Sequence, residues 1–286
     1  MIPNDNVRAV GPYQLARLLE SSSFGDRWLA QHQEHHTDWI IHRFAPSLDK
    51  GLRVLLLSWM ESAELFSHAH LPSITRVSGG LRGIEPGQID PGGIWAAEPY
   101  LGNEDGLLTV DRLVELKGGR MSAPETERVL LHTLDAMQFA HGLGICHGHL
   151  AASDLLVDRH GSITVDLYGL RRRLDGLLEL DPEVVLDEVR SVAMIGYWAL
   201  TGLEAEEPRI RASQLVRRLD RSWDEWFEVA LDPVGGFSTA ADALAALPSN
   251  GMRGARQVVE PKPNPARSVF ERLRTAWSST SDTDSR

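Results

Sequence analysis

The sequence contains very little lysine and almost no cysteine. Its 29 basic residues include only three lysines, Lys50, Lys117 and Lys262, and the others are arginines. Cys146 is the only cysteine, so the chain cannot close an internal disulfide, and a reducing, cytoplasmic setting is expected. The formal net charge of −11 argues against non-specific binding to nucleic acid.

Long hydrophobic runs are also absent. The longest, such as residues 54–57, are far too short to span a bilayer. The polar residues 1–10 carry no signal-peptide core and are expected to form a short tail. A chain of 286 residues with 42% hydrophobic content can still form one large two-lobed domain or two small ones.

Two kinds of pattern divide the chain. Aromatic and branched residues broken by Gly and Ser dominate the first part, whereas apolar residues at helical spacing dominate after residue 107. Ser122 followed by Glu125 has the spacing of a capping box and predicts the start of a helix. Strands are predicted over residues 13–30 and 39–44, a hairpin over 74–98, and helices over 52–66, 189–200, 223–231 and 239–247.

One segment resembles a known catalytic motif. Residues 147–154, His-Gly-His-Leu-Ala-Ala-Ser-Asp, resemble the His-Arg-Asp-Leu-x-x-x-Asn catalytic loop of eukaryotic-like serine/threonine protein kinases. In this alignment His149 replaces the catalytic base and Asp154 replaces the asparagine that binds magnesium. The resemblance therefore implies a kinase-like site whose catalytic groups are altered.

The glycine-rich loop of the family is also altered. Its positions correspond here to a stretch in which Glu20 and Ser22 stand in place of glycines and only Gly25 remains. Arg27 stands in place of the valine that would cover adenine. These replacements imply a degenerate phosphate-binding loop, and an ordinary polar hairpin turn is an equally good interpretation.

The strand and helix that hold the ATP phosphates in the family show further losses. Trp39-Ile40-Ile41-His42 aligns with Val-Ala-Ile-Lys, so His42 replaces the lysine and Ile40 narrows the adenine pocket. Glu61 is the best match for the glutamate that pairs with that lysine, and we expect it to be solvated.

Three further positions complete the degenerate nucleotide cleft that the resemblance implies. Ala97 aligns with the gatekeeper, Glu98 with the hinge glutamate, and Leu156 with the floor of the pocket.

The metal-binding aspartate of the family has no direct counterpart. Leu167 falls on its position, in the sequence Asp166-Leu167-Tyr168-Gly169 that aligns with the strand into Asp-Phe-Gly. Strand alternation predicts that Asp166 faces away from the cleft, unless a bulge turns it inward. His147 and Tyr168 still match buried packing positions, and Glu188 begins a motif that resembles the start of the central αF helix.

The resemblance covers about residues 11–248 and implies an α+β, bilobal protein-kinase-like fold. The β-rich N-lobe is expected over residues 11–98 and the helical C-lobe over residues 99–248. Its implied function is that of a pseudokinase, a regulatory or scaffolding module that binds a protein partner, without a metal or cofactor. The alternative is an unusual serine/threonine kinase, or a protein that binds ATP weakly with or without Mg²⁺, with Asp154 and Asp166 as metal ligands and His149 as base.

Two further interpretations remain open. Histidines 132, 141, 147 and 149 could suggest a zinc site, but buried packing roles explain them better. The segment 249–286 has the composition of a flexible tail. Within it, residues 266–277 could form an amphipathic helix that docks Phe270, Leu273 and Trp277 on a membrane or a partner.

Overall fold

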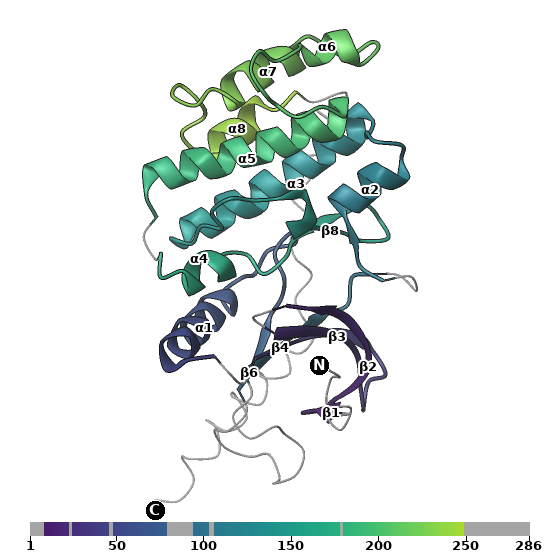
Figure 1. Cartoon of the computed structure of the whole chain (residues 1–286), viewed down its shortest axis with the longest axis vertical. Helices are drawn as coiled ribbons and strands as arrows, with labels where there is room; N and C mark the ends of the chain where they lie inside the picture. The colour runs from purple at the N-terminus through teal and green to yellow at the C-terminus, as the bar shows by residue number, and fades with distance from the viewer. Residues whose placement is uncertain are drawn as a thin grey trace, which may run out of the picture. The chain divides into compact units, whose positions relative to one another are not determined.

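The computed structural model describes residues 9–22, 25–45, 48–78, 94–102, 106–177 and 180–248. The chain divides into two units, Met1–Pro248 and Ser249–Arg286, and the second lies entirely outside the described residues. Within the first unit, strands predominate before residue 100 and helices after residue 109 (Figure 1). Across the described residues, no helix combines the length and the apolar character needed to cross a bilayer.

The N-terminal lobe is built on a six-stranded antiparallel sheet with strand order β1-β2-β3-β4-β6-β5. Its strands are β1 (Ala9–Val10), β2 (Tyr13–Ser21), β3 (Gly25–His32), β4 (Asp38–Phe44), β5 (Thr75–Ser78) and β6 (Ile94–Pro99). The register of β2 against β3 shifts twice, and such irregularities increase the local twist of a sheet. On one face, Tyr13, Ile41, Trp95 and Ala97 belong to a small apolar cluster.

Helix α1 (Lys50–Ala63) is the helix of this lobe, and its inner face is apolar. Asp49 caps it by accepting a hydrogen bond from the backbone nitrogen of Leu52 at 2.8 Å. Trp59 is 1% exposed and donates its indole N–H to the backbone oxygen of Tyr168 at 2.8 Å. This bond joins α1 to the segment that leads into α4 (Leu170–Leu174), beside which α1 lies in Figure 1.

Two long helices form the centre of the C-terminal lobe. They are α3 (Ala123–Gly142) and α5 (Pro182–Thr201), which pack against each other. At Gly196 a side-chain carbon would lie 2.6 Å from a methyl group of Leu130, so the small residue permits this close approach. The capping box at Ser122 is confirmed, since the Glu125 carboxylate accepts hydrogen bonds from the backbone N–H and hydroxyl of Ser122.

Shorter elements surround this pair. They are α2 (Val110–Leu116), α6 (Ala212–Leu215), α7 (Ser222–Ala230) and α8 (Ala240–Ala246). A three-stranded sheet of β7 (Leu108–Thr109), β8 (Leu155–Val157) and β9 (Ile163–Val165) lies next to them, and the 3-10 turn η1 (Ala152–Asp154) leads into β8. This sheet positions the two loops that form the C-lobe side of the candidate site.

Candidate functional site

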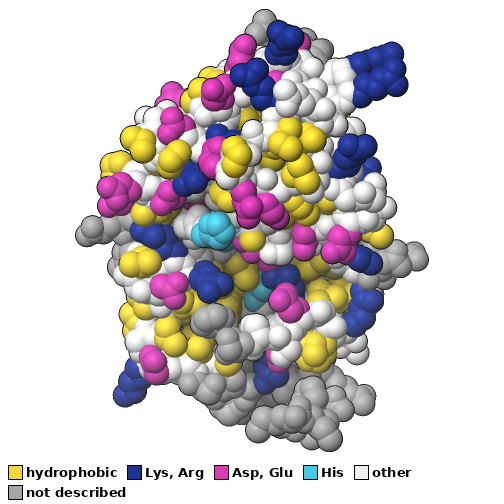
Figure 2. Space-filling model, turned by 45° about the horizontal axis from the view of Figure 1, so that its top comes forward, with side chains coloured by type: hydrophobic (Ala, Val, Ile, Leu, Met, Phe, Trp, Pro, Cys, Tyr) yellow, Lys and Arg dark blue, Asp and Glu magenta, His cyan; other side chains and the backbone are white. Residues whose placement is uncertain are grey.

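A cleft of about 680 Å³ lies between the β2–β3 hairpin and the loops beside β8 and β9. Most of the residues that line it have polar or charged side chains, and they come from both lobes. On the face drawn in Figure 2, histidine side chains lie at a central hollow among basic and acidic groups. The residues singled out from the sequence that line the cleft are Glu20, Ser22, Gly25, Arg27, His42, His149, Asp154, Asp166 and Leu167.

The hairpin at the cleft edge is tightly closed. Ser22 and Gly25 exchange backbone hydrogen bonds of 2.8 and 3.3 Å. Gly25 has a φ of 153°, and a side-chain carbon there would collide with the backbone of Arg43 and Phe44. Only glycine fits this position, so the retention of Gly25 has a structural cause that needs no phosphate.

The pairing of β4 with β6 decides which side chains face the cleft. Ile40 lies directly opposite Glu98, and Ile41 lies opposite Ala97. Opposed residues of antiparallel strands share a face. Ala97 therefore lies with Ile41 in the small apolar cluster, and Glu98 lies on the cleft side with Ile40. The alignment placed Ala97 in the gatekeeper position, and the register puts Ala97 on the face opposite to Ile40 and Glu98.

Glu98 has a specific partner on this face. Its Oε1 lies 2.7 Å from Nε2 of His42, and both residues are buried, at 3% and 4% exposure. In the family alignment His42 occupies the lysine position, and Glu61 is the counterpart of the glutamate that pairs with this lysine. Glu61 was expected to be solvated here, and it lies exposed on α1 and does not line the cleft. The carboxylate that contacts the altered lysine position thus comes from β6 rather than from α1.

An ion pair crosses the cleft between the lobes. The guanidinium of Arg27, on β3, donates a hydrogen bond to Oδ2 of Asp166, just after β9. It also lies 3.3 Å from the Glu20 carboxylate. Burial lowers the pKa of Arg27, but Asp166, Glu20 and Glu98 outweigh it and raise the pKa above its usual value. The carboxylates therefore hold the guanidinium in its charged form inside the cleft.

Asp166 faces the cleft, contrary to the expectation from strand alternation. The regular strand β9 ends at Val165, and Leu167 has a φ of 41°. Alternation requires extended backbone, so it does not extend past Asp166. A hydrogen bond of 2.8 Å from the Asp166 backbone nitrogen to the Asp154 oxygen fixes this turn. Burial raises the pKa of the Asp166 carboxyl, and Arg27 opposes that rise.

Glu188 holds the segment that resembles a catalytic loop against helix α5. This glutamate of α5 is fully buried and accepts hydrogen bonds from the His147 backbone nitrogen at 2.6 Å and the Tyr168 hydroxyl at 2.8 Å. Its second oxygen lies 2.8 Å from Nε2 of His141. The rings of His147 and Tyr168 stack with centroids 5.3 Å apart. The packing roles expected for His147 and Tyr168 are consistent with these contacts.

The residues that align with the family's catalytic base and metal ligands differ in exposure and in contacts. His149 is exposed at the cleft mouth, and Asp154 uses its carboxylate to accept a 2.8 Å hydrogen bond from the Ala151 backbone nitrogen. Burial lowers the pKa of His147, and no described group hydrogen-bonds its ring nitrogens. Leu167 lines the cleft and offers no oxygen to a metal.

The zinc interpretation of histidines 132, 141, 147 and 149 gains no support from their positions. His141 contacts Glu188, whereas His132 stacks on His70 with ring centroids 3.8 Å apart. Among the described residues, the one group of three side chains with metal-binding geometry is His42, Glu98 and Asp166. Sequence reasoning did not combine these three, because they are far apart in the chain and only two had been assigned to the cleft.

Comparisons with known proteins agree with this arrangement. No family model matches the chain. Two crystal structures of the PknI kinase domain of Mycobacterium tuberculosis superpose with TM-scores of 0.60 and 0.61 at 16% identity, over 84% of this chain and 97% and 96% of theirs. The chain has a protein-kinase-like fold. The α+β, bilobal fold expected from the sequence is thereby confirmed.

Curated relatives are protein kinases as well. CBL-interacting protein kinase 21 of Oryza sativa subsp. japonica is 25% identical over 68% of this chain, and CBL-interacting protein kinase 9 is 27% identical over 43%. A probable cell division protein kinase of Encephalitozoon cuniculi is 22% identical over 38%. The matches span only 38%, 32% and 39% of these relatives' own lengths.

Proposed function

We propose that this protein-kinase-like chain is a catalytically inactive domain that acts as a regulatory or scaffolding module for a protein partner. The observation that carries the proposal is the ion pair between Arg27 and Asp166 across the cleft. In the family alignment Arg27 stands where a small apolar residue would cover adenine. A guanidinium that is paired with Asp166 links the lobes without a nucleotide.

The remaining nucleotide positions support the same proposal. Ile40, Glu98 and Leu156 are only 0%, 3% and 3% exposed, and none of them lines the open cleft. The three residues that align with the adenine side of a nucleotide cleft are therefore closed off from the open cleft. His42 forms a hydrogen bond with Glu98, and the Leu167 side chain has no atom that could bind a metal. These residues are a poor match for a magnesium nucleotide.

A thermal-shift titration with ATP, in the presence of Mg²⁺ or of Mn²⁺, tests whether the cleft binds a nucleotide. A ligand at 100 times its Kd stabilises a protein by about 2.7 kcal/mol, which a melting curve detects easily. We expect no shift for the wild-type chain at millimolar ATP. The variant Arg27→Val, which removes the guanidinium from the adenine position, is the matched variant and should respond more strongly than the wild type.

Phosphoryl transfer provides the second measurement. We expect no incorporation of labelled γ-phosphate into the chain itself or into generic acceptors. A magnesium-dependent shift together with incorporation that disappears in Asp166→Asn would contradict the proposal and favour an unusual serine/threonine kinase. The tail residues Phe270, Leu273 and Trp277, expected from the sequence to dock on a partner or a membrane, lie outside the described residues.

A further inference from the structure

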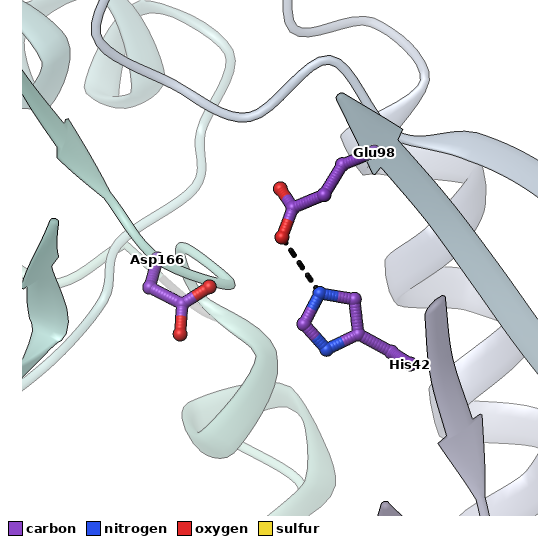
Figure 3. Close-up of side chains that lie close together, drawn as sticks. All are labelled: His42, Glu98 and Asp166. Carbon is purple, nitrogen blue, oxygen red and sulfur yellow. Dashed lines mark hydrogen bonds and ion pairs between the residues drawn. The ribbon is translucent and has the colours of Figure 1, made fainter. Parts of the chain in front are cut away.

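Three buried side chains from both lobes point toward one another in the cleft. His42 comes from β4, Glu98 from β6, and Asp166 from the turn after β9 (Figure 3). One ligand atom of each lies within 4.8 Å of those of the other two. The set contains one imidazole and two carboxylates, which are common ligands of divalent transition metals.

The hydrogen bonds around this cluster leave one acceptor unused. His42 and Glu98 contact each other, and Asp166 accepts from Arg27 through Oδ2. The other oxygen, Oδ1 of Asp166, is buried and has no hydrogen-bond partner. A buried carboxylate oxygen without a partner is costly, and native structures rarely leave one. An additional ligand at Oδ1 would remove this cost.

The charges favour a divalent cation as that ligand. The two carboxylates carry two negative charges, and Arg27 is the nearest permanent positive charge. Arg27, however, also lies 3.3 Å from Glu20, which can balance it. A divalent cation would then neutralise Glu98 and Asp166 together. Arg27 would remain bonded to the outer oxygen of Asp166, as partners of metal-bound carboxylates commonly do.

We infer that His42, Glu98 and Asp166 form a binding site for one tetrahedral transition-metal ion of the Zn²⁺ type. Metal–ligand distances of about 2.0–2.2 Å place the ligand atoms of a tetrahedral site about 3.4 Å apart. The present limit of 4.8 Å means that the widest pair of these atoms needs to approach by at most about 1.4 Å, whereas Nε2 of His42 and Oε1 of Glu98, now 2.7 Å apart, need to separate by about 0.7 Å. Small rotations of the three side chains are enough for this change.

The burial of the ligands selects against magnesium. Mg²⁺ keeps several of its waters and requires an octahedral shell, which three buried side chains cannot provide. Zn²⁺ needs four ligands and accepts a water as the fourth. His42 and Asp166 line the open cleft, so a water can reach that position. The site includes no residue of the loop 147–154, and it would hold β4 and β6 to the turn after β9.

The test is a titration of the metal-free full chain with Co²⁺, a spectroscopic substitute for Zn²⁺. Intense visible absorption that saturates at one equivalent is expected, because tetrahedral Co²⁺ absorbs far more strongly than octahedral Co²⁺. Zn²⁺ should abolish the band, whereas millimolar Mg²⁺ should leave it unchanged. Calorimetric titration with Zn²⁺ gives the affinity.

Variants of the three ligands locate the site. His42→Gln, Glu98→Gln and Asp166→Asn should each weaken binding by at least 10–100-fold, roughly the loss caused by removing a supporting partner of a metal ligand. His35→Gln is the matched control, because His35 stacks on His32 in an exposed turn where metals could bind adventitiously. It should leave the band unchanged.

Three results would overturn the assignment. These are the absence of a saturable band, a band that survives all three ligand variants, and a band lost in His35→Gln. If Asp166→Asn fails to fold, Glu98→Asp keeps the charge and shortens the ligand, and it should still weaken binding. A failure here is separable from a failure of the proposed function, since no measurement in this set involves ATP or phosphoryl transfer.

Discussion

Replacing Arg27 by methionine tests whether the ion pair across the cleft stabilises the fold. The guanidinium and the Asp166 carboxylate are 16% and 11% exposed as side chains, so this pair is largely withdrawn from water. Methionine retains an unbranched apolar stem that can pack along the same path. The substitution therefore removes the charge while leaving most of the packing in place.

The expected cost follows from the carboxylate that is left behind. Removing one partner of a buried ion pair costs about 3–5 kcal/mol, because an unpaired charge remains in a poorly solvated place. Burial already raises the pKa of Asp166, so in the variant this group can take up a proton and reduce the cost. We therefore expect Arg27→Met to lose about 2–3 kcal/mol of unfolding free energy at pH 7.

A second substitution isolates the origin of this loss. In Arg27→Met/Asp166→Leu no buried charge of this pair is left unpaired, since Glu20, the other partner of Arg27, is largely exposed, and replacing a buried pair by apolar groups is often neutral. The double variant should lie within about 1 kcal/mol of the wild type, which makes the two changes strongly non-additive. Arg112→Met is the surface control, because Arg112 pairs with Glu115 at about 60% exposure and should cost at most about 0.5 kcal/mol.

Urea unfolding followed by tryptophan fluorescence measures all four proteins, since the chain has eight tryptophans. Equal m-values would show that the substitutions change stability without changing the surface exposed on unfolding. A loss below 1 kcal/mol in Arg27→Met would refute the reasoning. A double variant as unstable as the two single losses combined would also refute it.

Two further predictions concern the C-lobe. Glu188→Gln, which keeps the shape of the side chain, should cost about 2–3 kcal/mol in urea unfolding, because a neutral amide oxygen replaces the carboxylate that accepts from His147 and Tyr168. His132 has a pKa lowered to about 4, and His70 also has a lowered pKa, by burial first in each case. The unfolded chain therefore binds more protons than the native one below pH 6.5, so stability should fall as the pH drops from about 6.5 to 4, by about 1–2 kcal/mol after allowing for solvent screening. His132→Gln, measured over the same range, should flatten this slope.

The fold could be predicted from the sequence because the residues at the packing positions still match the family in shape and polarity. Tyr168 is fully buried, and Glu188 supports the loop before it through backbone and hydroxyl hydrogen bonds. These roles require particular shapes and polar groups at fixed spacing, and motif order reveals them even where catalytic residues differ. The sequence motif that begins at Glu188, within α5, was the only sign that this residue has a structural role. It gave no indication of the three partners of Glu188, which are His141, His147 and Tyr168.

The sequence was a poorer guide to the side of the sheet on which an individual side chain lies. Glu98 and Ala97 are neighbours on β6, and a shift of one residue exchanges the cleft face with the opposite face. An alignment of motifs cannot resolve such a shift. Asp166 was expected to face outward because alternation was extended through Leu167, whose positive φ ends the extended backbone. Sequence pattern gives no warning of a positive φ at a leucine.

The residues at the altered nucleotide positions form pairs that balance each other's charge or polarity inside the cleft. Arg27 would be costly in the cleft without Asp166, and buried Glu98 would be costly without His42. Arg27 and Glu98 are thus each satisfied by another residue of the same chain. Opening the lobes must break the Arg27–Asp166 contact, so the cost of opening is set by the protein itself.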